Sequence, residues 1–336
     1  MKRKLHCLIL CLGTIGFVEA QILEVENFEN LTLGNISTST NGTTVGQGGF
    51  YALNGAPNNY QIINDASPHG KVLQITGQSD GSQQDFTLFK NNLPTLWASR
   101  SALNSIIEIE FDLFTGPATT SLNVQILFLY DQSQTKVLTG FGYLPETREL
   151  LGVTYYNNNG TVNNYAFKLS QGGLFLPVNS WVRIGMSYNK TTGSVLWKAP
   201  GMPSAIGIIS AAVNLDPHVL KFIVEADPNN TLAFNTKWDN VSIKATNTNT
   251  LSSTNPIADL DKKIEIYPNP TSGFVTLKTD FNSEITKITI SDSSGRIHSV
   301  FTNYIEQIDF SKFNAGIYLL TIETNNGNAT RKIVKF

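Results

Sequence analysis

The sequence predicts an all-β protein made of two β-sandwiches in series, formed by residues 21–246 and 263–336. Short runs that alternate apolar and polar residues recur along most of the chain, and clusters of Asn, Thr and Gly separate them. The one helix candidate, near Pro94 to Leu103, is short. Because a single open sheet would leave one face uncovered, we expect each segment to form two packed layers. A chain of 336 residues is long enough for two such domains.

The first 20 residues have the pattern of a secretory signal peptide. Lys2-Arg3-Lys4 precedes an apolar run from Leu5 to Val18, and Val18-Glu19-Ala20 is a small-residue cleavage site. The run is too short for a membrane-spanning helix, and Leu10 before Cys11 disfavours a lipoprotein signal. No later stretch is long and apolar enough, so we expect no transmembrane segment after cleavage.

Composition narrows the chemistry of the mature chain. Both cysteines, Cys7 and Cys11, lie in the signal peptide, so we expect neither disulfides nor thiol-based sites. Residues 1–20 contain three basic residues and one acidic residue, and their removal leaves 21 basic against 25 acidic residues, a net charge of −4. A mildly acidic protein is a poor partner for nucleic acid, which binds clustered Lys and Arg.

The larger segment contains a series of predicted strands. They run over residues 72–76, 106–114, 124–130, 151–156, 181–188, 219–225 and 238–245. Within this segment, Trp181-Val182-Arg183-Ile184 with the following Thr192-Gly193 resembles a hairpin of concanavalin A-like, laminin-G-like jelly rolls. Trp238-Asp239-Asn240-Val241 resembles their closing strand and Gly46–Phe50 their early glycine-rich turn. The resemblance implies a jelly-roll sandwich with Trp181 and Trp238 in its core.

Three carboxylates alternate along one predicted strand. Glu108, Glu110 and Asp112 should project from the same face, because alternate residues of a strand do. Laminarinase-type glucanases of the jelly-roll group carry catalytic acids as Glu-x-Asp-x-Glu, and by that resemblance Glu108 would be the nucleophile and Asp112 the acid. Asp112 is one carbon shorter than the family's Glu, so we favour a solvent-facing polar strand without catalysis.

Aromatic residues near predicted loops are the candidates for binding sugars, since flat rings stack on the apolar faces of pyranoses. Asparagines that could bind hydroxyl groups are interleaved with them. The candidate ligand-binding residues are Trp97, Tyr143, Tyr155, Tyr156 and Trp197.

A structural calcium ion is the only cofactor that the sequence suggests. Glu24, Glu26 and Asp239 lie near the two ends of the larger segment, which pair in many jelly rolls, and carboxylate oxygens suit Ca²⁺. The three histidines of the mature chain, His69, His218 and His298, are isolated from any catalytic motif.

Residues 247–262 are polar and without periodicity, as in a flexible linker. The segment that follows contains Tyr267-Pro268-Asn269-Pro270-Thr271-Ser272-Gly273, a turn at Asp292–Arg296, Asn314–Leu320 and a final Lys332–Phe336. Glycine alone accepts a positive φ without strain, and we expect Gly316 to reverse the chain in this way. In this order these motifs resemble the type A C-terminal sorting domain of cargo for the type IX secretion system of Bacteroidetes. The residues that carry the resemblance are Tyr267, Pro268, Asn269, Pro270, Gly273, Gly295, Gly316, Tyr318, Lys332 and Lys335.

The resemblance implies partners and a destination. The partners would be the outer-membrane translocon and its sortase, and the protein would be secreted or held at the outer-membrane surface after passing the periplasm. The alternative is a terminal immunoglobulin-like sandwich without a signalling role. For the larger segment we expect non-catalytic binding of a polysaccharide or surface glycan. A secreted glycoside hydrolase and a protein-binding adhesin are the alternatives.

Overall fold

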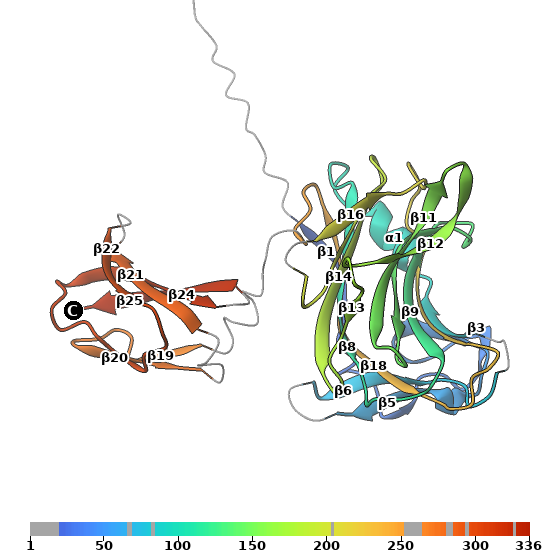
Figure 1. Cartoon of the computed structure of the whole chain (residues 1–336), viewed down its shortest axis with the longest axis horizontal. Helices are drawn as coiled ribbons and strands as arrows, with labels where there is room; N and C mark the ends of the chain where they lie inside the picture. Colours follow the sequence, from blue (N-terminus) through green and yellow to red (C-terminus); the bar gives the residue numbers. More distant parts are fainter. Residues whose placement is uncertain are drawn as a thin grey trace, which may run out of the picture. The chain divides into compact units, whose positions relative to one another are not determined.

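A computed structural model of the chain describes residues 20–65, 69–81, 85–202, 205–251, 264–279, 285–292, 296–324 and 327–336. It divides the chain into two compact units, residues 1–252 and 253–336 (Figure 1). Apart from Ala20, the predicted signal peptide lies outside the described residues, as does the part of the predicted linker from Ser252 onward.

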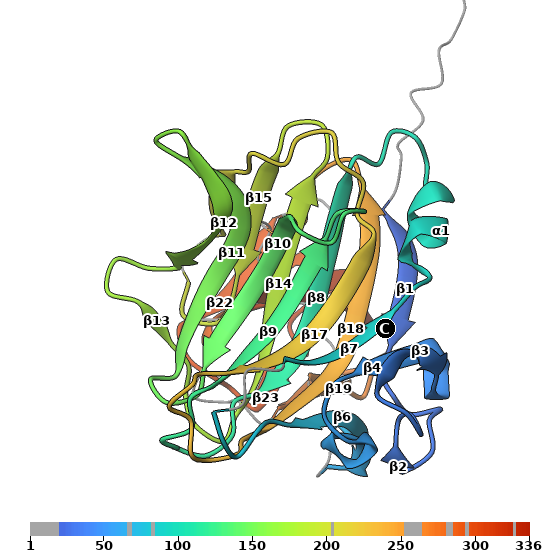
Figure 2. The same ribbon diagram turned by 90° about the vertical axis from the view of Figure 1, so that its right-hand side faces the viewer.

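The first unit is a sandwich of two nine-stranded antiparallel sheets, which we name A and B. Sheet A contains β1 (Gln21–Glu26), β2 (Gly34–Asn35), β5 (Tyr60–Asn64), β6 (Lys71–Thr76), β8 (Ile106–Phe114), β14 (Trp181–Asn189), β15 (Ser194–Lys198), β16 (Ile206–Ile209) and β18 (Asn235–Thr246). Sheet B contains β3 (Asn41–Val45), β4 (Phe50–Leu53), β7 (Phe86–Lys90), β9 (Asn123–Tyr130), β10 (Val137–Leu144), β11 (Glu149–Asn158), β12 (Thr161–Lys168), β13 (Leu174–Phe175) and β17 (Val219–Ala226). Figure 2 looks onto sheet B, with β9, β17 and β7 side by side. The prediction of an all-β sandwich is confirmed.

Strand alternation explains which residues form the core of this unit. In β8, Ile107, Ile109, Phe111 and Leu113 are buried between the sheets, whereas the carboxylates between them lie on the opposite, outer face. Trp238 of β18 is in this core. Short helical segments, α1 (Leu93–Ala98) and the 3₁₀ turns η1 (Gln47–Gly49) and η2 (Pro57–Asn59), connect the strands.

The prediction that Trp181 is a core residue is wrong. Trp181 begins β14 but lies half-buried on the outer face of sheet A, where its ring stacks on His69 with a centroid distance of 4.0 Å. Its indole nitrogen donates a hydrogen bond to Asp65 at 3.0 Å. Trp181 therefore contacts Asp65 and His69, which follow β5 and precede β6, on the outside of the sandwich.

The segment after β18 also folds onto the outer face of sheet A. Leu251 is only 4% exposed, and a Cβ on Gly185 of β14 would lie 2.7 Å from its side chain. Thr250 donates its backbone N–H to buried Glu108 at 2.5 Å, and the hydroxyl of Thr250 also bonds to this carboxylate. We call residues 247–251 the strap. The predicted boundary of the linker at residue 247 is corrected, because the strap is packed on the first unit.

The second unit is a small sandwich of a three-stranded and a four-stranded sheet. The first sheet contains β19 (Glu265–Tyr267), β20 (Phe274–Lys278) and β23 (Gln307–Asp309), and the second β21 (Ile285–Asp292), β22 (Ile297–Phe301), β24 (Gly316–Thr324) and β25 (Gly327–Lys335). Their facing residues, such as Val275, Ile290, Phe310 and Leu320, form a hydrophobic core of their own.

The first and last motifs of this unit are joined to each other. The side-chain amide of Asn269 donates to the carbonyl of Lys332 at 2.7 Å and accepts from the N–H of Val334 at 2.9 Å. The backbone of Thr271 then bonds to Val334 and Phe336. These contacts attach the Tyr-Pro-Asn-Pro-Thr segment to β25, which explains why residues far apart in the sequence belong to one motif set.

The other predicted motif residues have different environments. Tyr318 is buried, and its hydroxyl donates to the carbonyl of Asn314. Gly316 is the first residue of β24, and its φ is not positive. The predicted left-handed reversal at Gly316 is therefore wrong. Gly295 lies outside the described residues. Tyr267, Pro268, Pro270 and Lys332 are exposed.

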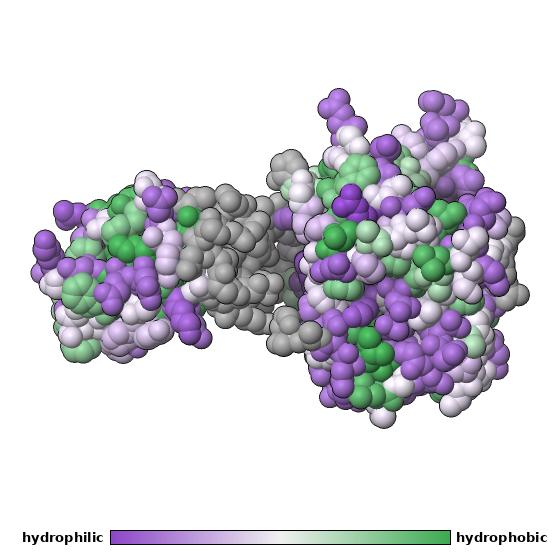
Figure 3. Space-filling view, turned by 60° about the horizontal axis from the view of Figure 1, so that its bottom comes forward, coloured by the Kyte–Doolittle hydropathy of each residue, from purple (hydrophilic) through white to green (hydrophobic). Residues whose placement is uncertain are grey.

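In the part of the chain that the structure describes, no helix has the length and apolar character needed to cross a membrane. On the face drawn in Figure 3, apolar residues form small patches separated by hydrophilic ones. Scattered apolar residues of this kind are usual on protein surfaces.

Candidate functional site

The outer face of sheet B carries a row of aromatic residues around one lysine. Tyr51 pairs with Phe89, Phe89 with Lys221, and Lys221 with Phe128 on the neighbouring strands β4, β7, β17 and β9. Tyr130 follows two residues after Phe128 on the same strand. We call these five residues the aromatic row. Their chain neighbours belong to the core between the sheets, so the row itself faces outward.

Contacts between these side chains join them into one surface. The rings of Tyr51 and Phe89 are stacked with centroids 5.6 Å apart and an angle of 21° between them. Phe128 and Tyr130 meet edge to face at 5.9 Å. The ammonium of Lys221 lies 5.7 Å from the centroid of Phe89 and 5.3 Å from that of Tyr130. Lys221 therefore connects the two aromatic pairs, and all five side chains are half-buried.

Two glycines of β10 leave space beside the aromatic row. Gly140 pairs with Phe128, and a Cβ at Gly140 would lie 2.3 Å from Cδ1 of that ring. The ring of Phe128 therefore lies across the backbone of β10, in space that any other residue would fill. Two residues on, a Cβ at Gly142 would meet only Val124, at 3.9 Å, so a side chain would fit at this position without a clash.

Partial burial changes the ionisation of groups on this face. Burial lowers the pKa of Lys221 and raises that of Glu225, which the neighbouring charge of Asp85 raises further. Burial, followed by the charges of Asp85 and Glu225, raises the pKa of Tyr130 to about 12. The face is therefore partly dehydrated, a condition under which hydrogen bonds and charge pairs to a ligand are stronger than in water.

Three of the five aromatic residues predicted to bind a ligand are enclosed in the protein. Trp97, Tyr143 and Trp197 are at most 2% exposed. Their polar atoms donate to Asp216, to the carbonyl of Thr115 and to the carbonyl of Gly140, respectively. No ring face is left for a sugar, and the prediction is corrected for these three residues.

The other two predicted aromatic residues, Tyr155 and Tyr156 of β11, are half-buried. Lys136 lies 5.6 Å from the ring centroid of Tyr155. The ring of Tyr156 packs edge to face against Tyr165 and Phe167 of β12. Tyr156 thus stabilises the β11–β12 hairpin, whereas Tyr155 packs partly against the core of the first unit.

The carboxylates of β8 are engaged by other residues of sheet A. Lys244 binds Glu110 at 3.0 Å, and Arg183 binds Asp112 at 3.1 Å. Glu108 is 1% exposed beneath the strap, and burial raises its pKa, opposed by the two hydrogen bonds from Thr250. The expectation that Glu108 faces solvent is wrong, and neither Glu108 nor Asp112 is free to act as the alternative catalytic pair.

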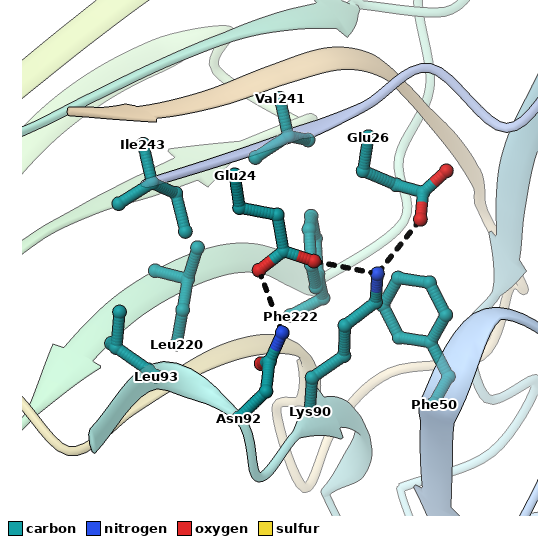
Figure 4. A pocket seen from close by; sticks show the side chains of 10 residues that line it. All are labelled: Glu24, Glu26, Phe50, Lys90, Asn92, Leu93, Leu220, Phe222, Val241 and Ile243. Carbon is teal, nitrogen blue, oxygen red and sulfur yellow. Dashed lines mark hydrogen bonds and ion pairs between the residues drawn. The ribbon is translucent and has the colours of Figure 1, made fainter. Parts of the chain in front are cut away.

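The three predicted calcium ligands do not converge. Lys90 of β7 binds Glu24 at 2.8 Å and Glu26 at 2.7 Å, between the two sheets (Figure 4). Burial lowers the pKa of Lys90, but the hydrogen bonds and charges of Glu24 and Glu26 outweigh it and leave the pKa raised. The remaining cavity measures about 30 Å³, room for a water molecule or two.

Asp239 lies apart from these glutamates and takes part in a different cluster. It bonds to Nδ1 of His69 at 2.7 Å and to the side-chain amide of Asn240 at 3.1 Å. Among the described residues, no three His, Cys, Asp or Glu side chains are grouped as a metal site. The calcium prediction is corrected, since an ammonium group occupies the position between Glu24 and Glu26.

Sequence reasoning missed the aromatic row, although a signal for it exists. Residues 124–130 are apolar at nearly every position, including Val124, Ile126 and Phe128, which alternate with the core residues. When a strand is apolar on both faces, either other parts of the protein cover both faces or one face forms a surface that binds a ligand. Glycines at alternate positions of the next strand, Gly140 and Gly142, were a second signal.

Comparisons with known proteins bear chiefly on the second unit. Residues 265–335 match the family model described as a secretion system C-terminal sorting domain. No curated protein matches the chain.

Solved structures similar to the chain share little sequence with it. A sialidase is 9% identical over 59% of this chain and 17% of its own length, with a TM-score of 0.39. The cellulose-induced protein Cip1 is 14% identical over 67% of this chain and 97% of its own, with a TM-score of 0.42. The binding domain of a botulinum neurotoxin, solved with rat synaptotagmin II, is 11% identical over 88% of this chain and 71% of its own, with a TM-score of 0.39. At these values the likeness says nothing of function. Residues 265–335 carry the C-terminal sorting domain of type IX secretion, which marks the chain as cargo bound for the cell surface or the medium.

Proposed function

We propose that residues 21–251 bind a polysaccharide or a cell-surface glycan without cleaving it, once the sorting domain has directed the chain out of the cell. The observation that carries this proposal is the aromatic row on the outer face of sheet B. Apolar sugar faces stack on such rings, and binding removes both surfaces from water.

Polar groups within the row suit the hydroxyl groups of a sugar. The phenol oxygens of Tyr51 and Tyr130 have no hydrogen-bond partner among the described residues. A half-buried hydroxyl that lacks a partner gains one when a ligand binds, which fixes the orientation of the ligand.

The opposite face of the sandwich is a poorer candidate. On sheet A, the strap covers Glu108 and Gly185, and the ring of His69 stacks on Trp181. The charged residues between them are paired with one another. A ligand there would have to break contacts that the protein already makes.

For the export route, we propose that the predicted signal peptide directs the chain to the periplasm and that the sorting domain is recognised by the outer-membrane translocon. A sortase would then remove the sorting domain after the strap, and the first unit would remain at the surface or in the medium. Residues 247–251 belong to the folded body, so removal beyond them would leave it intact.

Binding of the mature chain to a panel of laminarin, xylan and alginate tests the function. We expect retardation of the protein in gels that contain its ligand, and a loss of affinity of about 10-fold or more in Phe128→Ala, since a buried Phe contributes about 1.5–3 kcal/mol. Phe175→Ala is the matched control, because Phe175 is exposed on β13 and outside the row. Equal binding by Phe128→Ala would reject the site. If the protein releases reducing ends from a glycan, it is a glycoside hydrolase and not a non-catalytic binder. If it binds none of the glycans, the result favours a protein-binding adhesin.

A further inference from the structure

Unlike four other half-buried lysines of the first unit, Lys221 has no carboxylate within ion-pair distance among the described residues. Lys90, Lys190, Lys237 and Lys244 each lie within 3.0 Å of a carboxylate oxygen. The ammonium of Lys221 lies over the rings of Phe89 and Tyr130, at 5.7 and 5.3 Å from their centroids.

This position is unfavourable for a cation unless a further partner is present. Burial removes part of the hydration of the ammonium, and two rings at more than 5 Å replace it only partly. The nearest acid on the same strand, Glu225, is four residues away, about 13 Å along β17. At that distance and physiological salt the two charges are largely screened from each other.

A second lysine repeats this arrangement at the other side of sheet B. Lys136, before β10, lies over the ring of Tyr155 and has no carboxylate partner among the residues described. Lys136 and Lys221 are therefore two cations that lie over aromatic rings of sheet B and have no carboxylate partner among the described residues. The protein as a whole carries a net charge of −4 after signal cleavage. General attraction between the protein and a polyanion is absent, so binding of one would depend on this local site.

We propose that the glycan is an anionic polysaccharide whose carboxylate or sulfate group binds Lys221 while its sugar rings stack on the aromatic row. This inference rests on the proposed glycan-binding function and specifies the ligand class. The row crosses four strands, about 14 Å from Tyr51 to Phe128. A segment of an extended chain fits this length better than a single terminal sugar, and Lys221 in the middle of the row would select its charged units.

Affinity measurements on the mature chain test the ligand class. The probes are polygalacturonate, dextran sulfate and uncharged dextran, so the carboxylate and sulfate sources are separated by the first two. We expect Lys221→Met to weaken binding of the favoured polyanion about 10- to 100-fold, as for a hydrogen bond to a charged group. Lys221→Arg should restore most of it, and added salt should weaken wild-type binding. Lys244→Met, which removes an ion-paired lysine from sheet A, is the matched control and should bind as wild type.

The possible outcomes distinguish the anionic ligand class from the proposed glycan binding itself. Unchanged affinity of Lys221→Met for the polyanions, with binding still lost in Phe128→Ala, would overturn the anionic ligand and leave glycan binding standing. Preference for uncharged glycans would do the same. If no glycan of either kind binds the wild-type protein, both proposals fail. Tryptophan fluorescence checks that each variant is folded, because Trp97, Trp181, Trp197 and Trp238 all lie in the first unit.

Discussion

Asp239 is the acid whose ionisation the fold alters most clearly. It is 1% exposed, and burial raises its pKa to about 6, although the hydrogen bonds from His69 and Asn240 act in the opposite direction. The ordinary value is 3.8. Between these two pH values the folded state holds a proton that the unfolded state has released. The free energy of unfolding must therefore fall as the pH rises from about 4 to about 6.

Asp239→Asn should remove this part of the pH dependence. Two units of pKa shift correspond to at most about 3 kcal/mol, so the wild-type protein should lose up to that amount relative to the variant across this interval. Denaturant unfolding of the mature chain, followed by tryptophan fluorescence, measures it for the first unit alone. Parallel pH profiles for the two proteins would show that Asp239 titrates normally.

At the scale of single residues, the sequence did not predict which aromatic side chains are buried. Trp97 and Trp197 were chosen because they are aromatic and near loops, yet each finds a buried acceptor for its indole N–H. Phe128 was passed over because it reads as one more apolar residue of a strand. Whether a ring faces the core or the solvent depends on which neighbours cover it, and a single strand does not contain that information.

Among the elements, the strap shows how a segment that looks like a linker becomes part of the fold. Asn249 and Thr250 are polar and lack periodicity, as expected for flexible chain, but they bond to Ser187 and Glu108 of sheet A. Gly185 leaves the space that Leu251 fills. These partners are distant in sequence, so the strap could not be predicted from its own residues. The strands, whose periodicity is local, were predicted correctly.

Leu251→Ala should destabilise the first unit by about 2 kcal/mol, near the lower end of the range for buried leucine. The reason is that Leu251 is buried against Gly185 and keeps the strap over Glu108. The midpoint of urea unfolding, read by tryptophan fluorescence, should fall accordingly. Leu232→Ala is the control, since Leu232 is 46% exposed and should cost less than about 0.5 kcal/mol. Equal midpoints for the two variants would mean that the strap is not held.

For the molecule as a whole, the two units have separate hydrophobic cores. One contains Trp238, Phe111 and Phe222, and the other Ile290, Phe310 and Leu320. The sequence predicted this division because each unit has its own series of alternating strands and the motifs of the second are local. The first unit extends further than predicted, because the strap, residues 247–251, is packed on it.

Separate cores allow the export signal to be removed without unfolding its cargo. Deletion of residues 263–336 removes the sorting domain and leaves the strap and the core of the first unit complete. We expect the truncated protein to keep its tryptophan fluorescence and to accumulate inside the cell envelope, as immunoblots of cell fractions would show. Phe128→Ala, altered only in the aromatic row, should leave the cell like the wild type. A truncated protein found in the medium or on the surface at wild-type levels would show that export does not depend on the second unit. Retention together with lost fluorescence would mean that the first unit needs the second in order to fold.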